Sequence, residues 1–409
     1  MRICLFFDDL FGWHGGSEEA GLIYECLSLS RELTDEIVVV SKRGRDSLFW
    51  RAGRAIKHLA RRHVSSGEGE GAKTRHVARD VMIRGFLGPS AQIVWLPHWT
   101  HDMARWMRRH ADVAGPFWRD RMEWAECLPW VGFLPDCQHK YLPHFFSDEE
   151  LAHRNRVYLY LLDRAPVVVV KSRYTRNDVL RYFGHRRAEV IVLPFTAAPR
   201  REWFAGDLEA TRLKYQLPKD YFICSNQFWA HKNHGIVLEA LRLARAEGQP
   251  CFFAFTGTPH DDRDPGYFGR LMQKAKDTGV AHDFKVLGLI PKLDQISLMR
   301  AARSVVQPSL FEGNPGGLSS HDAISVGQRL IVSDIPINRE IETYVDHYFN
   351  PTDARALLDG MRKVGEPSMK TSPDELIRLG IERRRECGRV LRAAFSRAIE
   401  RVGRAGSTR

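Results

Sequence analysis

The chain has 409 residues, more than one hydrophobic core usually supports, so two domains are expected. Hydrophobic residues make up 44% of it and charged residues 27%, which excludes a disordered chain. Lys and Arg outnumber Asp and Glu by 61 to 50. This bias could attract a nucleic acid, an anionic membrane or a diphosphate substrate, and charge alone does not choose among them.

The seven cysteines are scattered and form no CxxC pair, which predicts reduced thiols rather than a disulfide framework or a zinc site. The N-terminal sequence MRICLFFDD becomes acidic too early for a signal peptide, and no apolar run is long enough to span a bilayer. We therefore expect a cytoplasmic protein.

Apolar, β-rich runs alternate with amphipathic stretches along the chain, a pattern typical of βαβ units. Residues 1–7 predict a first strand, and residues 17–33 predict a helix capped by Ser17. The loop between them contains Gly15 and Gly16, whose backbone could closely approach a phosphate or a sugar; a plain tight turn is the alternative. Later strands of the same sheet are expected at residues 36–40, 92–96, 130–134, 167–170 and 190–193.

Asp136 and His139 follow the strand at 130–134, at the end of the sheet where ligands bind in doubly wound folds. Most lone histidines are structural, but this position makes both side chains candidates. Two basic and aromatic stretches, residues 51–63 and 103–124, could rest on an anionic membrane or form solvated helix faces. Residues 65–73 predict a flexible polar loop.

Residues 196–217 lack a strand pattern and predict a connection between domains. Alternation then resumes, with strands expected at residues 221–225, 251–256, 284–287, 304–307 and 329–333 and a charged helix at about 373–402. The predicted fold is α/β, with two doubly wound Rossmann-like domains facing across a cleft. Its expected divisions are an acceptor-binding domain (1–200), a linker (201–217), a nucleotide-sugar-binding domain (218–372) and a helical segment that could cross back to the first domain (373–409).

Two loops of the second half carry candidate ligand-binding residues. After the strand at 221–225 come Gln227, His231, Lys232 and His234; the compact ammonium of a lysine suits a diphosphate, although most lysines are simply surface residues. After the strand at 304–307, the sequence PSLFEGNPGGLSSHDA places Pro-Gly-Gly before a helix that Ser319 or Ser320 could cap. The candidates in this loop are Glu312, Asn314, Gly316, Gly317 and Asp322.

These motifs resemble glycosyltransferase family 4, the retaining nucleotide-sugar transferases of the GT-B fold. PSLFEG and DAISVGQRLIVSDIP match the two ends of that family's C-terminal motif, and SNQFWAHKNH resembles members in which glutamine replaces a basic residue. LPDCQHKYLPHFFS resembles the acceptor-domain loop, with Pro135-Asp136 in place of the usual His-Asp pair. The acidic loop is two residues longer than usual, and its second acid is Asp.

The resemblance implies roles for individual residues. Lys232 would neutralise the donor diphosphate, Glu312 would hold the sugar hydroxyls, and Asp322 would bind the ribose. The backbone at Asn314, Gly316 and Gly317 would contact the sugar or phosphate, and Gly15 and Gly16 would lie over the diphosphate. His231 or Arg173 could replace the charge that Gln227 lacks, and His139 could replace the missing histidine beside Asp136.

The expected function is therefore retaining transfer of a hexose from a nucleoside diphosphate sugar to a glycan or lipid-linked acceptor in surface polysaccharide biosynthesis. The sequence Asp261-Asp262-Arg263-Asp264 is assigned to a surface loop, so no metal or other cofactor is expected. Peripheral contact with the inner face of an anionic membrane is part of the expectation, and nucleic-acid binding is not. The alternatives are an epimerase or hydrolase of the same architecture, and a basic non-enzymatic binding protein.

Overall fold

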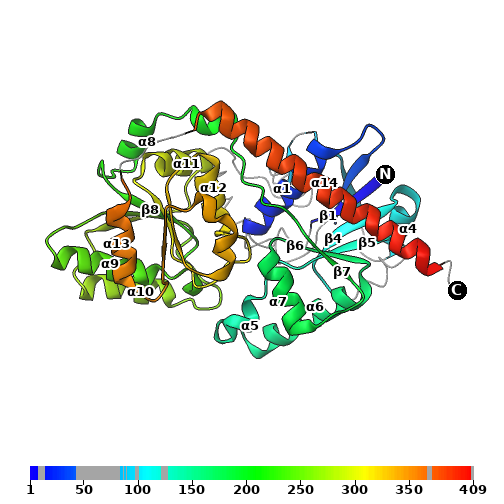
Figure 1. Ribbon diagram of the computed structural model, residues 1–409, viewed down its shortest axis with the longest axis horizontal. Coiled ribbons are helices and arrows are strands. Elements are labelled where there is room, and N and C mark those ends of the chain that lie inside the picture. The colour runs from blue at the N-terminus through cyan, green and yellow to red at the C-terminus, as the bar shows by residue number, and fades with distance from the viewer. Residues whose placement is uncertain are drawn as a thin grey trace, which may run out of the picture.

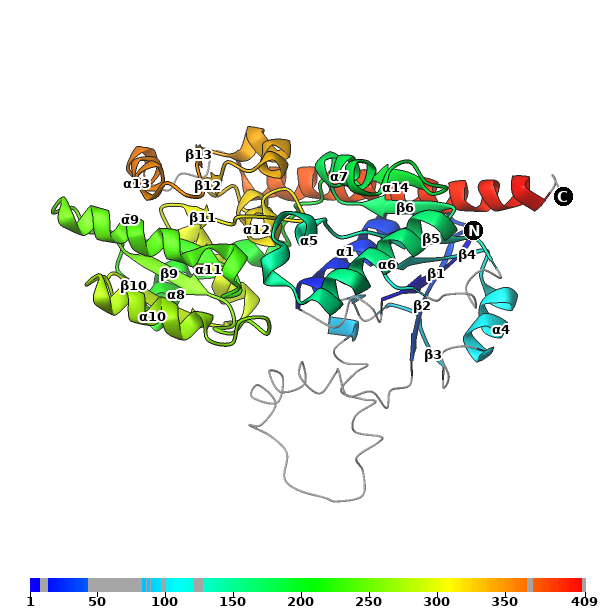
Figure 2. The same ribbon diagram turned by 90° about the horizontal axis from the view of Figure 1, so that it is seen from below.

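The computed structural model describes residues 1–7, 14–42, 83–85, 87–88, 90–96, 101–120, 128–365 and 371–406. These residues form two lobes side by side, each built on a twisted parallel sheet, and the long helix α14 runs along the N-terminal lobe (Figure 1, Figure 2). The predictions for residues 51–63 and 65–73 concern segments outside the described residues.

The N-terminal sheet has the strand order β3-β2-β1-β4-β5-β6-β7, with every neighbouring pair parallel. The strands are β1 Arg2–Phe6, β2 Glu36–Lys42, β3 Ile93–Leu96, β4 Val113–Phe117, β5 Trp130–Phe133, β6 Val167–Val170 and β7 Glu189–Val192. The helices are α1 His14–Ser30, α4 His101–His110, α5 Gln138–Tyr141, α6 Asp148–Arg164 and α7 Arg173–Phe183, with the 3-10 turn η2 Pro143–Phe145.

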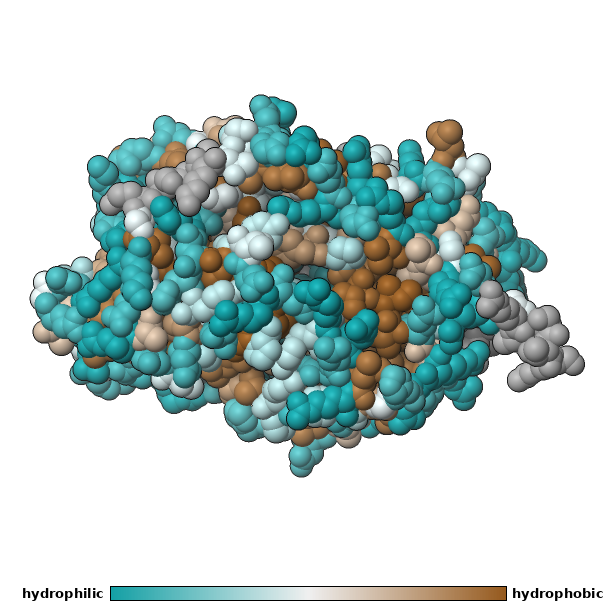
Figure 3. Space-filling view, in the orientation of Figure 1, coloured by the Kyte–Doolittle hydropathy of each residue, from teal (hydrophilic) through white to brown (hydrophobic). Residues whose placement is uncertain are grey.

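Both faces of this sheet are covered by helices because its strands bury alternate residues on opposite sides. In β1, Ile3 and Leu5 pack into the core below α1 and α14, whereas Cys4 and Phe6 pack into the core formed with α4, α6 and α7. On the face shown in Figure 3, apolar surface gathers over the N-terminal lobe and polar side chains cover most of the remainder.

The C-terminal sheet has the order β10-β9-β8-β11-β12-β13, again all parallel. Its strands are β8 Phe222–Ser225, β9 Phe253–Thr256, β10 Phe284–Gly288, β11 Val305–Gln307, β12 Leu330–Ser333 and β13 His347–Phe349. Its helices are α9 His234–Ala246, α10 Tyr267–Asp277, α11 Lys292–Ala301, α12 Gly317–Ser325 and α13 Ala354–Lys363. The 3-10 turns are η4 Ala230–Lys232 and η5 Pro336–Tyr344.

The segment between the sheets forms η3 Arg201–Phe204 and α8 Leu208–Lys214, both packed on α11. The final helix, α14 Pro373–Gly406, packs mainly on α1, and Arg384 of α14 bonds Glu25 of α1 and the carbonyl of Ala198. The domain boundaries proposed above remain a prediction, because contacts between helices and strands do not show which parts of the chain fold independently.

Several local predictions are wrong. The stretch 103–124 is not one surface segment: it contains α4, and then β4, which is completely buried in the centre of the sheet. Helix α1 begins at His14, so Ser17 lies inside it rather than at its cap. Strands β4 and β13 were not expected. A run of basic residues precedes β4, and β13 has only three residues.

The six cysteines that the structure describes are free thiols. Among the described residues, no helix is both long and apolar enough to cross a membrane.

Candidate functional site

The predicted loops of the C-terminal lobe leave the sheet at the point where its strand order reverses. Strand β8 is followed along the chain by β9 on one side, while β11 joins its other side, so the loops after β8 and β11 diverge there. Such a switch point is where doubly wound sheets bind ligands. Lys232 lies in the loop after β8 and Glu312 in the loop after β11, and the fold brings the two together.

Lys232 and Glu312 form an ion pair, with 2.6 Å between Nζ and Oε1. Their side chains are only 13% and 6% exposed, so this pair is shielded from solvent. The same Glu312 oxygen accepts a bond of 2.7 Å from Gln307 Nε2, and Gln307 Oε1 accepts one of 2.7 Å from Asn226. The carboxylate is thus held in one orientation by a buried polar chain.

Gln307 and Asn226 were missed by the sequence prediction. Both are polar residues at the carboxyl ends of apolar strands, and that position is the signal that could have identified them. Asn233, which follows Lys232, holds the same loop by donating to the carbonyls of Pro308 and Pro351.

A glycine turn packs directly against this ion pair. Gly316 and Gly317 have φ of +73° and +68°, and α12 begins at Gly317 with Gly316 as its N-cap. A Cβ on Gly317 would lie 2.7 Å from Glu312 Oε2, so a side chain here would displace the carboxylate. The prediction that Ser319 or Ser320 caps the helix is wrong, because two left-handed glycines start the helix earlier than a serine cap would.

Three buried oxygen atoms, one in the loop after β11 and two in the first turns of α12, have no hydrogen-bond partner among the described residues. They are Asn314 Oδ1, Ser319 Oγ and Ser320 Oγ. Unpaired buried polar atoms are costly, and a site that binds polar ligands is one place where they are retained. Asn338, which sequence reasoning missed, fixes the turn by accepting a bond of 2.9 Å from the Gly316 amide.

Asp322 lies near the lobe junction and is paired with Lys292, 2.6 Å away, which also lies 3.5 Å from Glu18 of α1. Burial raises the pKa of Asp322 to about 6 even though Lys292 opposes that shift. A ribose hydroxyl at Asp322 would therefore meet a carboxylate already engaged by an ammonium group, a partner that the sequence prediction missed.

Gly15 and Gly16 lie in the first turn of α1 rather than in a loop before it, and residues 8–13 lie outside the described residues. The N–H groups in the first turn of a helix have no hydrogen-bond partner within that helix, so this helix end can bind an anion.

The loop after β5 brings Asp136, but not His139, to the lobe junction. A Cβ on Gly313 would lie 3.0 Å from Asp136 Cβ, and the Asp136 carboxylate pairs with Arg154 at 3.0 Å. His139 is buried in the N-terminal lobe, edge-on to Tyr158, with Nε2 3.2 Å from Asn155 Oδ1. Burial lowers the pKa of His139 to about 4, which is characteristic of a neutral core histidine.

The side-chain oxygen of Gln227 accepts a bond of 2.8 Å from the Thr258 amide, so Gln227 would contact a donor phosphate through its side-chain NH2 group and brings no charge. His231 and Arg173 were expected to compensate for its missing charge. Burial lowers the pKa of His231 well below its usual range, so the ring is neutral. Arg173 is 73% exposed and lies 3.8 Å from Glu340.

The assignment of residues 261–264 to a surface loop is wrong for two members. Asp261 is 3% exposed and accepts bonds from the amides of Ala230 and Arg263, because its carboxylate anchors this segment to the loop after β8. The Arg263 side chain reaches Gln138 of the N-terminal lobe. Among the described residues, no cluster of His, Cys, Asp and Glu could hold a metal ion.

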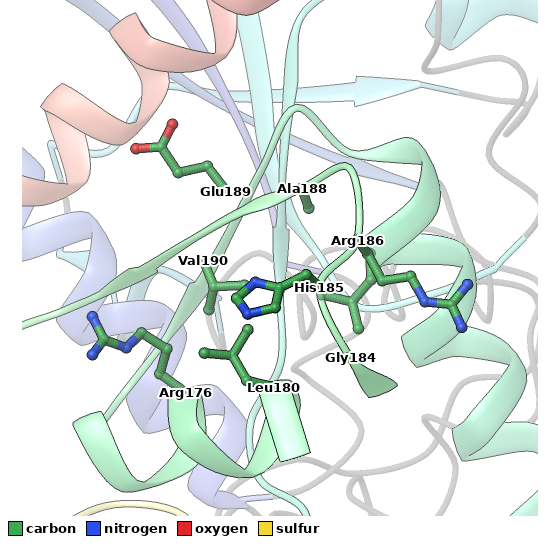
Figure 4. A pocket seen from close by; sticks show the side chains of 9 residues that line it. Arg176, Leu180, Gly184, His185, Arg186, Ala188, Glu189 and Val190 are labelled. Carbon is green, nitrogen blue, oxygen red and sulfur yellow. The ribbon is translucent and has the colours of Figure 1, made fainter. Parts of the chain in front are cut away.

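A separate cavity of about 280 Å³ lies at the β7 edge of the N-terminal lobe, where His185 and Val190 face each other between α7 and β7 (Figure 4). None of the predicted site residues lines it. Its side chains are partly engaged elsewhere: Arg186 pairs with Asp163, and Glu189 with Arg397.

The buried histidines make stability depend on pH. Burial lowers the pKa of His234 and of His321 to about 3. Unfolded histidines take up a proton near pH 6.5, so stability is fully present above that pH and is lost as the pH falls toward these native values, by about 1 kcal/mol per pH unit per histidine. We expect His234→Phe, which keeps the ring stacked on Phe228, to make the free energy of unfolding fall less between pH 7 and pH 5. Urea unfolding at both pH values measures this difference. The same change in the free energy of unfolding between pH 7 and pH 5 in both proteins would contradict the prediction.

A known protein family and several solved structures resemble this chain. Residues 209–375 match the family model described as glycosyl transferases group 1. No curated protein matches the sequence closely. Among solved structures, HepE of Anabaena in complex with UDP and glucose has a TM-score of 0.59 at 14% identity, with 100% of both chains covered.

Sucrose-phosphate synthase of Thermosynechococcus elongatus has a TM-score of 0.55 at 14% identity, covering 100% of this chain and 98% of that one. The lipopolysaccharide outer core galactosyltransferase WaaB has a TM-score of 0.55 at 12% identity, with 96% and 99% covered. At these identities the likeness concerns the fold, and it extends over the whole chain. Residues 209–375 are thus a glycosyl transferases group 1 domain, in a chain that has the two-lobed GT-B fold of glycosyltransferases.

Proposed function

We propose that this chain transfers a hexose from a nucleoside diphosphate sugar to a glycan or lipid-linked acceptor, with retention at the anomeric carbon. The observation that carries the proposal is the shielded pair of Lys232 and Glu312 at the switch point, packed against the Gly316–Gly317 turn. Glycosyl transfer itself is the activity of the group 1 domain. HepE, which shares the fold, was solved with UDP and glucose, and this supports a nucleotide sugar as the donor.

In the proposed reaction the bond between the anomeric carbon and the diphosphate oxygen breaks, the acceptor oxygen bonds to the same carbon, and the acceptor proton passes to the departing diphosphate. Charge accumulates on the departing diphosphate, so a preorganised cation there lowers the barrier. Lys232 would supply that cation, and Glu312 would accept hydrogen bonds from donor-sugar hydroxyls. The unpaired oxygens of Asn314, Ser319 and Ser320 offer further acceptors for such hydroxyls.

Asp322 would bind the ribose, the first-turn amides of α1 at Gly15 and Gly16 would face the diphosphate, and Asp136 would face the acceptor. We propose no metal or other cofactor, because cationic side chains and helix ends can balance the diphosphate charge. His139 has no part in this mechanism, because its buried ring contacts Tyr158 and Asn155 within the N-terminal lobe.

A role in surface polysaccharide synthesis at the cytoplasmic face of a membrane belongs to the same proposal. Helix α4 carries the exposed residues Arg105, Arg108 and Arg109, which suit an anionic surface. No nucleic-acid partner is proposed.

The test of the proposed function is product analysis with a panel of UDP-, GDP- and ADP-sugars, with and without acceptor glycans or lipids. We expect transfer only when an acceptor is present, and a product whose anomeric proton coupling in NMR matches the donor configuration. Release of free sugar or of an epimer without acceptor would favour the hydrolase or epimerase. Salt-sensitive polyanion binding with no response to any nucleotide sugar would favour a non-enzymatic protein.

The packing of Gly317 against Glu312 gives a prediction within this site. Gly317→Ala adds a Cβ 2.7 Å from Glu312 Oε2 at a φ of +68°, so the carboxylate must move. Displacements of about 1 Å in a catalytic site can cost about 10²-fold in rate, and we expect a loss of this order in kcat. Gly235→Ala in α9 is the matched control, because a Cβ there has no atom within 4 Å. Equal kinetics of the two variants would contradict the prediction.

A further inference from the structure

The one cationic side chain assigned so far to the donor phosphates, Lys232, does not by itself balance the charge of a diphosphate. A diphosphate leaving group carries at least two negative charges, and Lys232 contributes one positive charge. That charge is already balanced by Glu312 at 2.6 Å. Gln227 contributes none, and the histidine beside Lys232 is neutral because burial keeps its pKa low. A second cation is therefore needed close to the loop after β8.

The segment after β9 is built to place a side chain against that loop. A Cβ on Gly257, whose φ is +124°, would lie 2.1 Å from the Asn226 carbonyl oxygen, so the two backbones touch. The Thr258 amide donates to Gln227, and Asp261 Oδ2 accepts from the Ala230 amide at 3.0 Å. These contacts fix the segment from residue 257 to residue 263 along the length of the Lys232 loop.

Arg263 extends from this braced segment into the junction between the lobes. Its guanidinium lies 5.0 Å from the Phe146 ring centre in the N-terminal lobe and 5.8 Å from that of Trp229 in the C-terminal lobe. The side chain is 22% exposed. Aromatic contacts on a guanidinium hold its plane while leaving its N–H donors at the edge.

The terminal N–H groups of Arg263 make only long hydrogen bonds in this structure. One terminal nitrogen is 3.3 Å from Gln138 Oε1, and the other is 3.4 Å from His231 Nδ1, both at the long end of hydrogen bonding. The nearest carboxylate oxygen recorded for it among the described residues is on Asp261, 3.7 Å from Nε.

Arg154 also contacts Phe146, but its guanidinium forms an ion pair with the Asp136 carboxylate at 3.0 Å. Arg263 is thus a partly buried cation, oriented by its surroundings, whose nearest carboxylate among the described residues is the long contact to Asp261.

We propose that Arg263 binds the diphosphate of the donor and supplies the second positive charge in the site. The inference rests on the proposed function and adds a residue to its site. When the nucleotide binds, phosphoryl oxygens replace the long contacts to Gln138 and His231, because charge-assisted bonds from a guanidinium to phosphate are shorter and stronger. Arg263 also touches the N-terminal lobe, so the same contact would hold the lobes together around the donor.

The experiment is calorimetric titration of the full chain with UDP, GDP and ADP and with the matching monophosphates. We expect Arg263→Gln to weaken binding of the preferred diphosphate about 10- to 100-fold, and to change monophosphate binding far less, because only the outer phosphate loses a partner. Arg263→Lys keeps the charge without the fork and should fall between wild type and Arg263→Gln. Arg389→Gln is the matched control, since Arg389 is 64% exposed and pairs with Glu386 of its own helix, α14.

The possible outcomes separate the two proposals. A wild-type chain that binds no nucleoside diphosphate would overturn the proposed function. A wild-type chain that binds one, with Arg263→Gln unchanged or weakened equally for diphosphate and monophosphate, would overturn the role of Arg263 alone. An increase in the KM for the acceptor in Arg263→Gln, without a change in diphosphate affinity, would also overturn the role of Arg263 at the diphosphate. It would assign this cation to the acceptor. Thermal unfolding of Arg263→Gln and Arg263→Lys shows whether each variant is folded, and either one that folds decides the question.

Discussion

Lys232→Met is expected to lower kcat about 10²- to 10³-fold while leaving the fold intact. Removing one preorganised charge-stabilising group from a catalytic site typically has an effect of this size. The side chain is 13% exposed and its ammonium contacts Glu312, so methionine retains most of the packing and removes the charge together with that contact. Steady-state kinetics with the donor identified by product analysis measures the change.

The matched control is Lys214→Met, which breaks another lysine–carboxylate pair of 2.6 Å in the same lobe. That lysine is 59% exposed and pairs with Asp294 on α11, so its loss should leave kcat within about twofold, as exposed pairs contribute little. If Lys232→Met and Lys214→Met had the same kcat, the assignment of Lys232 to the leaving group would be wrong.

Gly388→Ala is expected to be the most destabilising small substitution in α14, with a loss of roughly 2–3 kcal/mol in the free energy of unfolding. A Cβ at this position would lie 2.0 Å from the Cys26 carbonyl oxygen and 2.3 Å from Ser30 Oγ, both on α1. A backbone carbonyl cannot rotate away as a side chain can, so the two helices would have to separate. Cys387 and Leu391, which flank this point, belong to the core that α14 shares with the sheet.

Gly403→Ala provides the comparison, because it makes the same change in the same helix where a Cβ meets no atom within 4 Å. Alanine is the better helix former by up to about 1 kcal/mol, so this variant should be as stable as wild type or slightly more stable. Urea unfolding followed by circular dichroism measures both. A Gly388→Ala protein as stable as Gly403→Ala would show that α14 does not pack on α1 at this distance.

Much of the fold could be predicted because parallel strands buried on both faces have a distinctive pattern. Runs such as Val167–Val170 are apolar throughout, and their order along the chain implies a doubly wound sheet. β4 escaped prediction because Gly115 and Pro116 interrupt its apolar run and basic residues surround it. The start of α12 was misplaced because a serine cap is visible in a sequence, whereas a left-handed glycine turn depends on the backbone around it.

The site was only partly predictable, for a different reason. Lys232 and Glu312 lie on loops whose convergence follows from strand order, so the resemblance of two motifs was enough to pair them. Lys292 and Arg263 act across the lobe junction, where their partners Glu18 and Gln138 are more than a hundred residues away in the chain. His139 shows the converse: its position after a strand suggested function, but the ring turns into the core, where burial keeps it neutral.

The structure of the chain with a bound nucleoside diphosphate would test the central claim most directly. We expect the outer phosphate within hydrogen-bonding distance of Lys232 and the Gly316–Gly317 turn, on the Glu312 side of the lobe junction. A nucleotide bound instead in the cavity beside His185, or on a face where Lys232 and Glu312 remain paired and untouched, would contradict it.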